Sequence, residues 1–263
     1  MRRVAVRLGL SLMSVTAALT MSMACAAATP TEAPAVGASP GGGTSGSAVR
    51  APAVGPAPSM RMPVDRRVSA VGFVDVRTAV PDAVLDLRYA TADNFVGERL
   101  YPPNARCLVH ESMTPGLRTA ARTLRARGEV LVFWDCYRPH SVQQKMFDKV
   151  PDPAWVARPG PYSTSHEAGR SVDVTLADGC PNCPPARVVG DRCRLDMGTD
   201  FDSFTPRATA YATEGVSAPA RAARTRLREA MAAGGLTIYA GEWWHFDGPG
   251  AHVRRPVIDV PVT

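Results

Sequence analysis

Two short stretches of the chain contain residue types that can bind a metal ion. The first holds His166 and Asp173, seven residues apart, with Gly169 between them. The second lies near the C-terminal end and holds Glu242 and His245. Two imidazoles and one carboxylate form a three-ligand set that catalytic zinc sites use, with a fourth position left for water or substrate. The pattern therefore predicts a hydrolytic zinc centre with His166, Asp173 and His245 as ligands.

The spacing alone leaves alternatives open. Asp247 lies two residues after His245 and could replace Asp173 as the carboxylate ligand. Each histidine also has a plainer interpretation, because a single histidine is more often an ordinary core or surface residue than a metal ligand. A set of this kind also accepts divalent metals other than zinc.

A hydrolytic centre also needs a base and a stabilising cation. Glu242 is the candidate base, which would take a proton from water and pass it to the leaving amine. It lies three residues before His245, so a regular strand would put the two on opposite faces, and we expect a twist or bulge there. Arg138 could stabilise the oxyanion. Its plainer alternative is a structural ion pair with Asp135.

Apolar patterns and turn signals predict the elements that must position these residues. Asp173 should share one strand face with Ser171 and Thr175, and Arg138 should follow a buried strand. Thr114 and Ser141 are expected to cap the first two helices, and the arginines of the third (221, 224, 226 and 228) to form a solvated face. The predicted strands are 71–75, 83–89, 129–137, 171–176, 236–239 and 257–260. The predicted helices are 114–127, 141–150 and 218–233, and the predicted loops are 91–106 and 178–196.

The first 65 residues are not expected to belong to the fold. Residues 1–28 have three arginines, an apolar run and then small residues, which is typical of a secretory signal peptide. Lipidation of Cys25, which would anchor the protein to a membrane, is the alternative to ordinary cleavage. Residues 29–65 are rich in Pro, Gly, Ala and Ser, which predicts a disordered linker. A single domain is therefore expected at 66–263.

The formal charge of +6 comes mostly from the N-terminal part of the chain. Through Arg67 there are seven arginines against two acidic residues, a net of +5, which leaves +1 for the remainder. The near-neutral domain gives no support to nucleic-acid binding.

Five cysteines follow Cys25: Cys107, Cys136, Cys180, Cys183 and Cys193. Export would permit disulfides, and the odd number leaves one thiol over. The Cys-x-x-Cys at 180–183 resembles a redox or zinc motif, but no second cysteine or histidine pair completes a metal set. We favour a surface loop that is cross-linked through Cys193.

Three motifs together resemble the zinc D-alanyl-D-alanine dipeptidases, relatives of the vancomycin-resistance dipeptidases in a larger group with D,D-carboxypeptidases and hedgehog-like domains. They are His-x6-Asp at 166–173, Glu-Trp-Trp-His at 242–245 and Asp-x-Tyr-Arg-Pro at 135–139. The resemblance runs from about Phe73 to Val260. It implies a single α+β domain with a central, mostly antiparallel sheet flanked by helices.

By position, the resemblance assigns one Zn²⁺ to His166, Asp173 and His245, the base to Glu242 and the transition-state cation to Arg138. It also assigns the carboxylate that holds the free amino group of the substrate to Asp202. Two positions depart from the family pattern: Thr164 stands where the family has a substrate-contacting Ser, and Ser171 where it has Ala. The cysteine-bearing insertion at 180–193 lies outside the pattern.

These observations predict an exported enzyme of the cell envelope or surroundings that cleaves D-Ala-D-Ala into two D-alanines. A buried Asp202 would reject longer chains, because they lack the charge that satisfies it. The alternative is a murein D,D-carboxypeptidase acting on stem peptides, which suits export and a long linker. A rival from another class is a non-enzymatic zinc or cell-wall binding module, although Glu242 and Arg138 together argue against it. The pattern gives no oligomeric state.

Overall fold

The computed structural model describes residues 64–263. The predicted signal peptide, Cys25 and nearly all of the predicted linker lie outside these residues. Asp65, the last residue of that linker, accepts a hydrogen bond from the backbone N–H of Arg67 and so caps helix α1, Arg66–Ala70.

A mixed, mostly antiparallel sheet forms the centre of the domain, which confirms the expected fold class. Its strands run in the order β2–β4–β6–β10–β9, and only the β2–β4 pair is parallel. The long strand β6 pairs with β10 at its start and with β8 at its end. The bounds are β2 Val84–Leu85, β4 Val130–Asp135, β6 Ser171–Asp178, β7 Val188–Val189, β8 Arg192–Arg194, β9 Thr237–Ile238 and β10 His245–Asp247.

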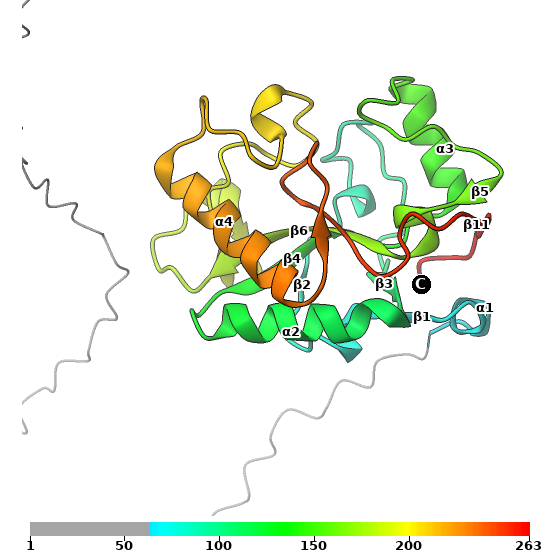
Figure 1. Cartoon of the computed structure of the whole chain (residues 1–263), viewed down its shortest axis with the longest axis horizontal. Coiled ribbons are helices and arrows are strands. Elements are labelled where there is room, and N and C mark those ends of the chain that lie inside the picture. Colours follow the sequence, from blue (N-terminus) through cyan, green and yellow to red (C-terminus); the bar gives the residue numbers. More distant parts are fainter. Residues whose placement is uncertain (1–63) are drawn as a thin grey trace, which may run out of the picture. The chain divides into compact units, whose positions relative to one another are not determined.

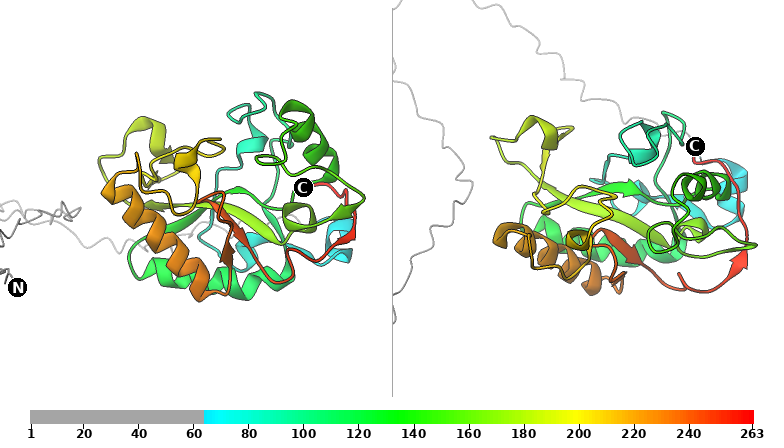
Figure 2. Two further views of the ribbon diagram at one scale, coloured as in Figure 1. Left: turned by 45° about the horizontal axis from the view of Figure 1, so that its top comes forward. Right: turned by 90° about the horizontal axis from the view of Figure 1, so that it is seen from above.

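Two small sheets lie beside the central one. They pair β1 (Phe73–Asp75) with β3 (Leu108–His110), and β5 (Tyr162–Ser163) with β11 (Arg255–Pro256). The insertion that carries β7 and β8 lies at the opposite end of the molecule from β5 and β11 (Figure 2). Short 3-10 helices connect the elements: Val76–Thr78, Arg88–Ala90, Glu111–Met113, Ser165–Ala168, Pro185–Arg187 and Pro206–Ala208.

Helices α2 (Thr114–Arg125) and α4 (Ala218–Ala233) pack against each other and against the sheet, whereas α3 (His140–Lys149) lies away from them (Figure 1). Every residue of β4 is buried, as its continuous apolar run predicts. No helix among residues 64–263 is both long and apolar enough to cross a membrane.

Several predicted boundaries are wrong for identifiable reasons. The strand predicted at 83–89 is only two residues long and gives way to the 3-10 helix at 88–90. The strand predicted at 257–260 does not form, because the backbone N–H groups of Ile258 and Val260 donate to the side chains of Ser163 and Tyr137.

The predicted caps of the first two longer helices are also wrong. Helix α2 begins at Thr114 itself, whose hydroxyl donates to the carbonyl of Glu111, and no side chain among the described residues caps its first turn. Helix α3 follows Pro139, and the hydroxyl of Ser141 donates to Asp259.

The arginines of α4 do not all face solvent, which corrects the predicted solvated face. Arg224 is 1 % exposed and donates to the carbonyls of Met197, Arg207 and Thr209. Its burial lowers the pKa of the guanidinium to about 10. Arg224 therefore links α4 to the loops at 197–209.

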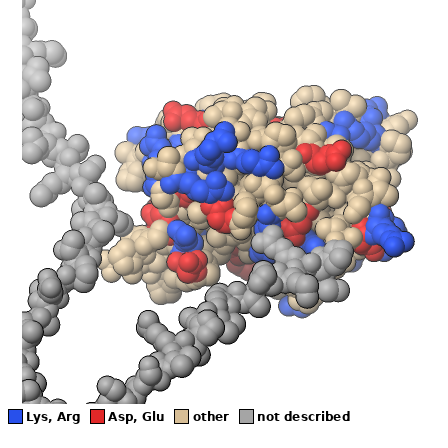
Figure 3. Space-filling view, turned by 90° about the horizontal axis from the view of Figure 1, so that it is seen from below, with Lys and Arg blue, Asp and Glu red and all other residues tan. Residues whose placement is uncertain are grey.

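Figure 3 shows other basic side chains gathered on one face with acidic side chains beside them.

Two disulfides form among the described residues. Cys183 pairs with Cys193, which confirms the predicted cross-link of the insertion. Cys107 pairs with Cys136, which joins the segment before β3 to the residue after β4. Cys180 belongs to neither disulfide.

Candidate metal centre and active site

Three polar residues form a row across the centre of the sheet. Asp135 on β4, Asp173 on β6 and His245 on β10 occupy paired positions on adjacent strands. The register between β4 and β6 shifts between Phe133 and Asp135, and this irregularity brings Asp135 opposite Asp173. The row places one carboxylate and one imidazole of the predicted metal site side by side.

His166 reaches the same place from the 3-10 helix that precedes β6. Gly169 ends this helix with φ +63°, and the chain turns there into the strand that carries Asp173. The Nδ1 atom of His166 lies 2.7 Å from the carbonyl oxygen of Cys136. A carbonyl can only accept a hydrogen bond, so Nδ1 carries the proton and Nε2 keeps its lone pair.

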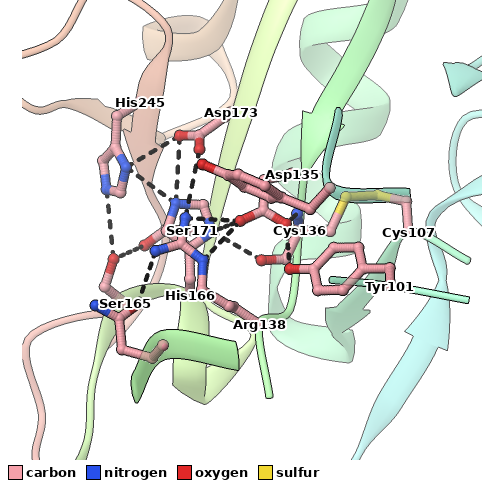
Figure 4. Close-up of polar contacts among 12 residues, drawn as sticks. Tyr101, Cys107, Asp135, Cys136, Arg138, Ser165, His166, Ser171, Asp173 and His245 are labelled. Carbon is pink, nitrogen blue, oxygen red and sulfur yellow. Dashed lines mark hydrogen bonds and ion pairs between the residues drawn. A yellow bond between two sulfur atoms is a disulfide. The ribbon is translucent and has the colours of Figure 1, made fainter. Parts of the chain in front are cut away.

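Three donor atoms converge where these elements meet (Figure 4). Nε2 of His166, Nδ1 of His245 and Oδ1 of Asp173 are 3.1–3.2 Å from one another. Three ligands at the usual zinc distances in a tetrahedral arrangement would be about 3.3 Å apart. The side chains therefore fit a small divalent ion with a fourth position left over.

Asp247 lies behind His245 and is not one of the three converging donors. Its Oδ1 is 3.1 Å from Nε2 of His245, and it also accepts a hydrogen bond from Ser171. This contact holds the proton of His245 on Nε2 and leaves Nδ1 free to bind a metal. The alternative that Asp247 replaces Asp173 as a ligand is thus not favoured by the geometry.

The electrostatics of the cluster favour a cation. Burial disfavours the imidazolium of His245, but hydrogen bonds to Asp173 and Asp247 outweigh it and raise the pKa to about 10. Burial likewise opposes ionisation of Asp173, yet His166 and His245 hold its pKa well below the ordinary value.

Glu242 lies in the turn before β10, with Oε2 3.8 Å from Nδ1 of His245. The sequence predicts a twist or bulge in a strand here, but Glu242 precedes the strand. The turn, in which the N–H of Glu242 donates to the carbonyl of Tyr239, removes the strand alternation that the expectation assumed. Burial, with Asp173 nearby, raises the pKa of Glu242 to about 7. A carboxyl with that pKa can exchange protons near neutral pH.

Arg138 forms the ion pair with Asp135 that the sequence offered as one of two alternatives. Its Nε and Nη2 donate to Asp135 at 2.9 and 2.7 Å, and its Nη1 donates to Gln143 at 2.7 Å. Its Nη2 is also 3.9 Å from Oδ2 of Asp173. The ion pair with Asp135 therefore holds the guanidinium beside the candidate metal ligands.

Asp202 and Thr164 line the same cavity as the residues described above. The hydroxyl of Tyr89 donates to Oδ2 of Asp202 at 2.7 Å, and burial raises the pKa of this carboxyl well above its ordinary value. The volume of the cavity is about 270 Å³, near the lower end of the range for ligand sites. A small ligand with a cationic group would fit this space.

Sequence reasoning missed several residues that line the cavity. Tyr89 carries no motif, because its partner Asp202 is 113 positions away in the sequence. Gln143 lies only five residues from Arg138, but a glutamine at that spacing has no distinctive pattern.

Phe95, Trp155 and Phe204 form an aromatic cluster on the cavity wall. The ring centroid of Phe204 is 5.2 Å from that of Phe95 and 5.3 Å from that of Trp155. Of these three, only Phe95 lies in a loop that the sequence predicted, at 91–106.

A family model and several relatives match the folded part of this chain. The D-Ala-D-Ala dipeptidase family of the M15 peptidases matches residues 69–263. The D-alanyl-D-alanine dipeptidase of Escherichia coli K12 is 34% identical over 181 residues, which cover 68% of this chain and 86% of the relative. The enzymes of the same name from Enterococcus faecium and Enterococcus faecalis are 28% and 27% identical, over 67% and 66% of this chain and 91% and 90% of their own. The chain therefore belongs to the D-Ala-D-Ala dipeptidase family and is a peptidase.

Proposed function

We propose that this peptidase hydrolyses D-Ala-D-Ala to two D-alanines with one zinc ion held by His166, Asp173 and His245. The observation that carries the proposal is the convergence of three lone-pair donors at 3.1–3.2 Å, with the second nitrogen of each imidazole held by a hydrogen-bond acceptor. A zinc ion in this place would supply Lewis acidity, which activates water and polarises a carbonyl group.

Glu242 acts as the base. Its pKa of about 7 suits a group that takes a proton from the attacking water and returns it to the departing amine. Arg138, fixed by Asp135 and Gln143, stabilises the negative charge that develops on the carbonyl oxygen of the scissile bond.

Asp202 and Tyr89 bind the free α-ammonium group of the dipeptide. Burial raises the pKa of Asp202, so its carboxyl favours the protonated form before substrate binds. A bound ammonium group stabilises the ionised carboxylate and takes the place of that proton. A longer or acylated peptide has an uncharged amide nitrogen at that position and must also fit a cavity of about 270 Å³. Thr164 contributes a further polar contact on the cavity wall.

Export remains part of this proposal. The two disulfides at Cys107–Cys136 and Cys183–Cys193 favour an oxidising compartment. We propose the cell envelope or the medium as the location, with lipidated Cys25 as one means of attachment.

The test is the release of D-Ala, detected with D-amino-acid oxidase. The purified protein is offered D-Ala-D-Ala, or an N-acylated tripeptide ending in D-Ala-D-Ala, each with and without a zinc chelator. Release that is sensitive to chelator and limited to the dipeptide supports the proposal. Release from the tripeptide would assign the protein to the carboxypeptidases instead, and no release from either would favour the non-enzymatic module.

A further inference from the structure

Cys136 joins a buried disulfide directly to the candidate metal centre. It follows β4 and lies between Asp135, which holds Arg138, and Tyr137. Cys136 is 2 % exposed and its partner Cys107 is fully buried. Figure 4 shows the disulfide beside the cluster of polar side chains.

The segment after β4 is bonded to His166 at two points. The carbonyl oxygen of Cys136 accepts from Nδ1 of His166 at 2.7 Å, and the N–H of Arg138 donates to the carbonyl of His166 at 3.1 Å. The first of these contacts selects the tautomer of the imidazole. If the Cys136 carbonyl turned away, Nδ1 would lose its acceptor and Nε2 would no longer be held as the free lone pair.

The other half of the disulfide is firmly held. The carbonyl of Cys107 accepts from the N–H of Val76 at 2.9 Å, and the next carbonyl, of Leu108, accepts from the N–H of Tyr137 at 2.8 Å. The cross-link therefore ties Cys136 to a segment that is itself hydrogen-bonded on both sides. The carboxylate of Asp135 adds a further restraint, because it accepts from the N–H of Cys136 and from the hydroxyl of Tyr101.

We propose that the Cys107–Cys136 disulfide is a positioning element of the metal centre. It holds the Cys136 carbonyl where His166 needs an acceptor, so that Nε2 of His166 is presented to the metal. The inference rests on the proposed function, because it takes His166 as a metal ligand. A disulfide that served only general stability would not change metal affinity in the folded protein.

The chain offers a matched control in its second disulfide. Cys183–Cys193 lies in the insertion, which is at one end of the molecule, and neither cysteine lines the cavity. The test compares two double variants of the full chain, Cys107→Ala/Cys136→Ala and Cys183→Ala/Cys193→Ala. Zinc affinity is measured by competition with a chromophoric chelator at a temperature where circular dichroism shows both variants folded. The visible spectrum of the cobalt-substituted protein reports the ligand geometry.

We expect loss of the Cys107–Cys136 pair to weaken zinc binding by roughly 10- to 100-fold, as loss of a group that orients a ligand does, and to change the cobalt spectrum. The control should stay within about twofold of the wild type. If the first variant does not fold, Cys107→Val/Cys136→Ala, which restores part of the lost volume, takes its place. Failure of both to fold would overturn the inference, because the bridge would then be needed for the fold rather than for one ligand.

Unchanged zinc affinity and cobalt spectrum in the folded variant would overturn the inference and leave the proposed function intact. Wild-type protein that binds no zinc and releases no D-Ala would instead remove the proposed function, and the inference with it. The wild type measured in the same series separates these two failures.

Discussion

Asp247 and His245 occupy the two ends of strand β10 and face each other, with Oδ1 of the carboxylate 3.1 Å from Nε2 of the imidazole. Residues two apart on a strand share a face, so the three-residue strand itself brings them together. Ser171 on the neighbouring strand donates to the same carboxylate. The strand thus carries both a candidate metal ligand and the group that orients it.

Removal of this carboxylate should weaken metal binding without unfolding the protein. We expect Asp247→Ala to lower zinc affinity by roughly 10- to 100-fold, because His245 loses the acceptor that fixes its tautomer. Competition with a chromophoric chelator measures the affinity. Asp259→Ala, which removes an exposed carboxylate that accepts from Ser141, is the control and should bind zinc like the wild type. Equal affinities in the two variants would contradict the role given to Asp247.

Glu242→Gln should separate metal binding from turnover. The glutamine keeps the size of the side chain but cannot accept the proton, so we expect zinc content to be retained and kcat to fall by roughly 10²–10⁴-fold. D-Ala release and metal analysis of the same sample measure both. Glu229→Gln changes an exposed residue of α4 and should leave both unchanged. Turnover near the wild-type rate would remove Glu242 from the mechanism.

The pH dependence should report the same carboxyl. Burial raises the pKa of Glu242 to about 7, and the base works only when it is deprotonated, so kcat/KM should rise as the pH rises through this region. A bound cation favours the carboxylate, which moves the acidic limb to pH 7 or lower. A pH profile of D-Ala release locates the limb. The residual activity of Glu242→Gln should lack it, and persistence of the same limb in that variant would assign it to another group.

Residue types, spacing and the family resemblance together selected candidate residues that the fold does bring together. His166, Asp173, His245, Glu242 and Arg138 all line one cavity, and the predicted fold class is confirmed. The three-residue spacing between Glu242 and His245 was misjudged, because a turn rather than a strand separates them. The alternation of side-chain faces predicts which residues are neighbours only for residues that form a strand.

Contacts between residues far apart in the sequence could not be found in this way. The resemblance pointed to Asp202, but its partner Tyr89 is 113 positions away and meets it only in the folded chain. Arg224 has the helical spacing of the buried face of α4, beside Ala223 and Leu227, but an arginine there is typical of a solvated face. In the fold, the carbonyls of Met197, Arg207 and Thr209 accept hydrogen bonds from it. No periodic pattern records such contacts, because they depend on how loops pack.

Asp202 should control the requirement for a free amino group. We expect Asp202→Ala to lower kcat/KM for D-Ala-D-Ala by roughly 10²-fold or more, because the substrate ammonium loses its charged partner. The loss for an N-acylated dipeptide should be much smaller. Asp200 lies two residues before Asp202 and its carboxylate pairs with Arg88. Asp200→Ala is therefore the control and should keep the wild-type preference. An unchanged ratio of the two substrates in Asp202→Ala would contradict this role.

Gly169 should tolerate no side chain, because it combines a positive φ with a close neighbour. A Cβ atom there would lie 2.5 Å from Cε1 of the buried Phe73 ring, and φ is +63°. We expect Gly169→Ala to lower the free energy of unfolding by at least about 2 kcal/mol, which sums the left-handed backbone penalty and the overpacking. Urea unfolding measures it.

Gly128 provides the control, because its φ is +75° and a Cβ there would meet nothing within 4 Å. Gly128→Ala should therefore pay only the backbone penalty, about 1 kcal/mol, and the difference between the two variants isolates the contact with Phe73. Phe73→Leu combined with Gly169→Ala should recover part of that difference by relieving the clash. If Gly169→Ala and Gly128→Ala were equally destabilised, the approach of Phe73 would not constrain the turn that sets His166 against Asp173.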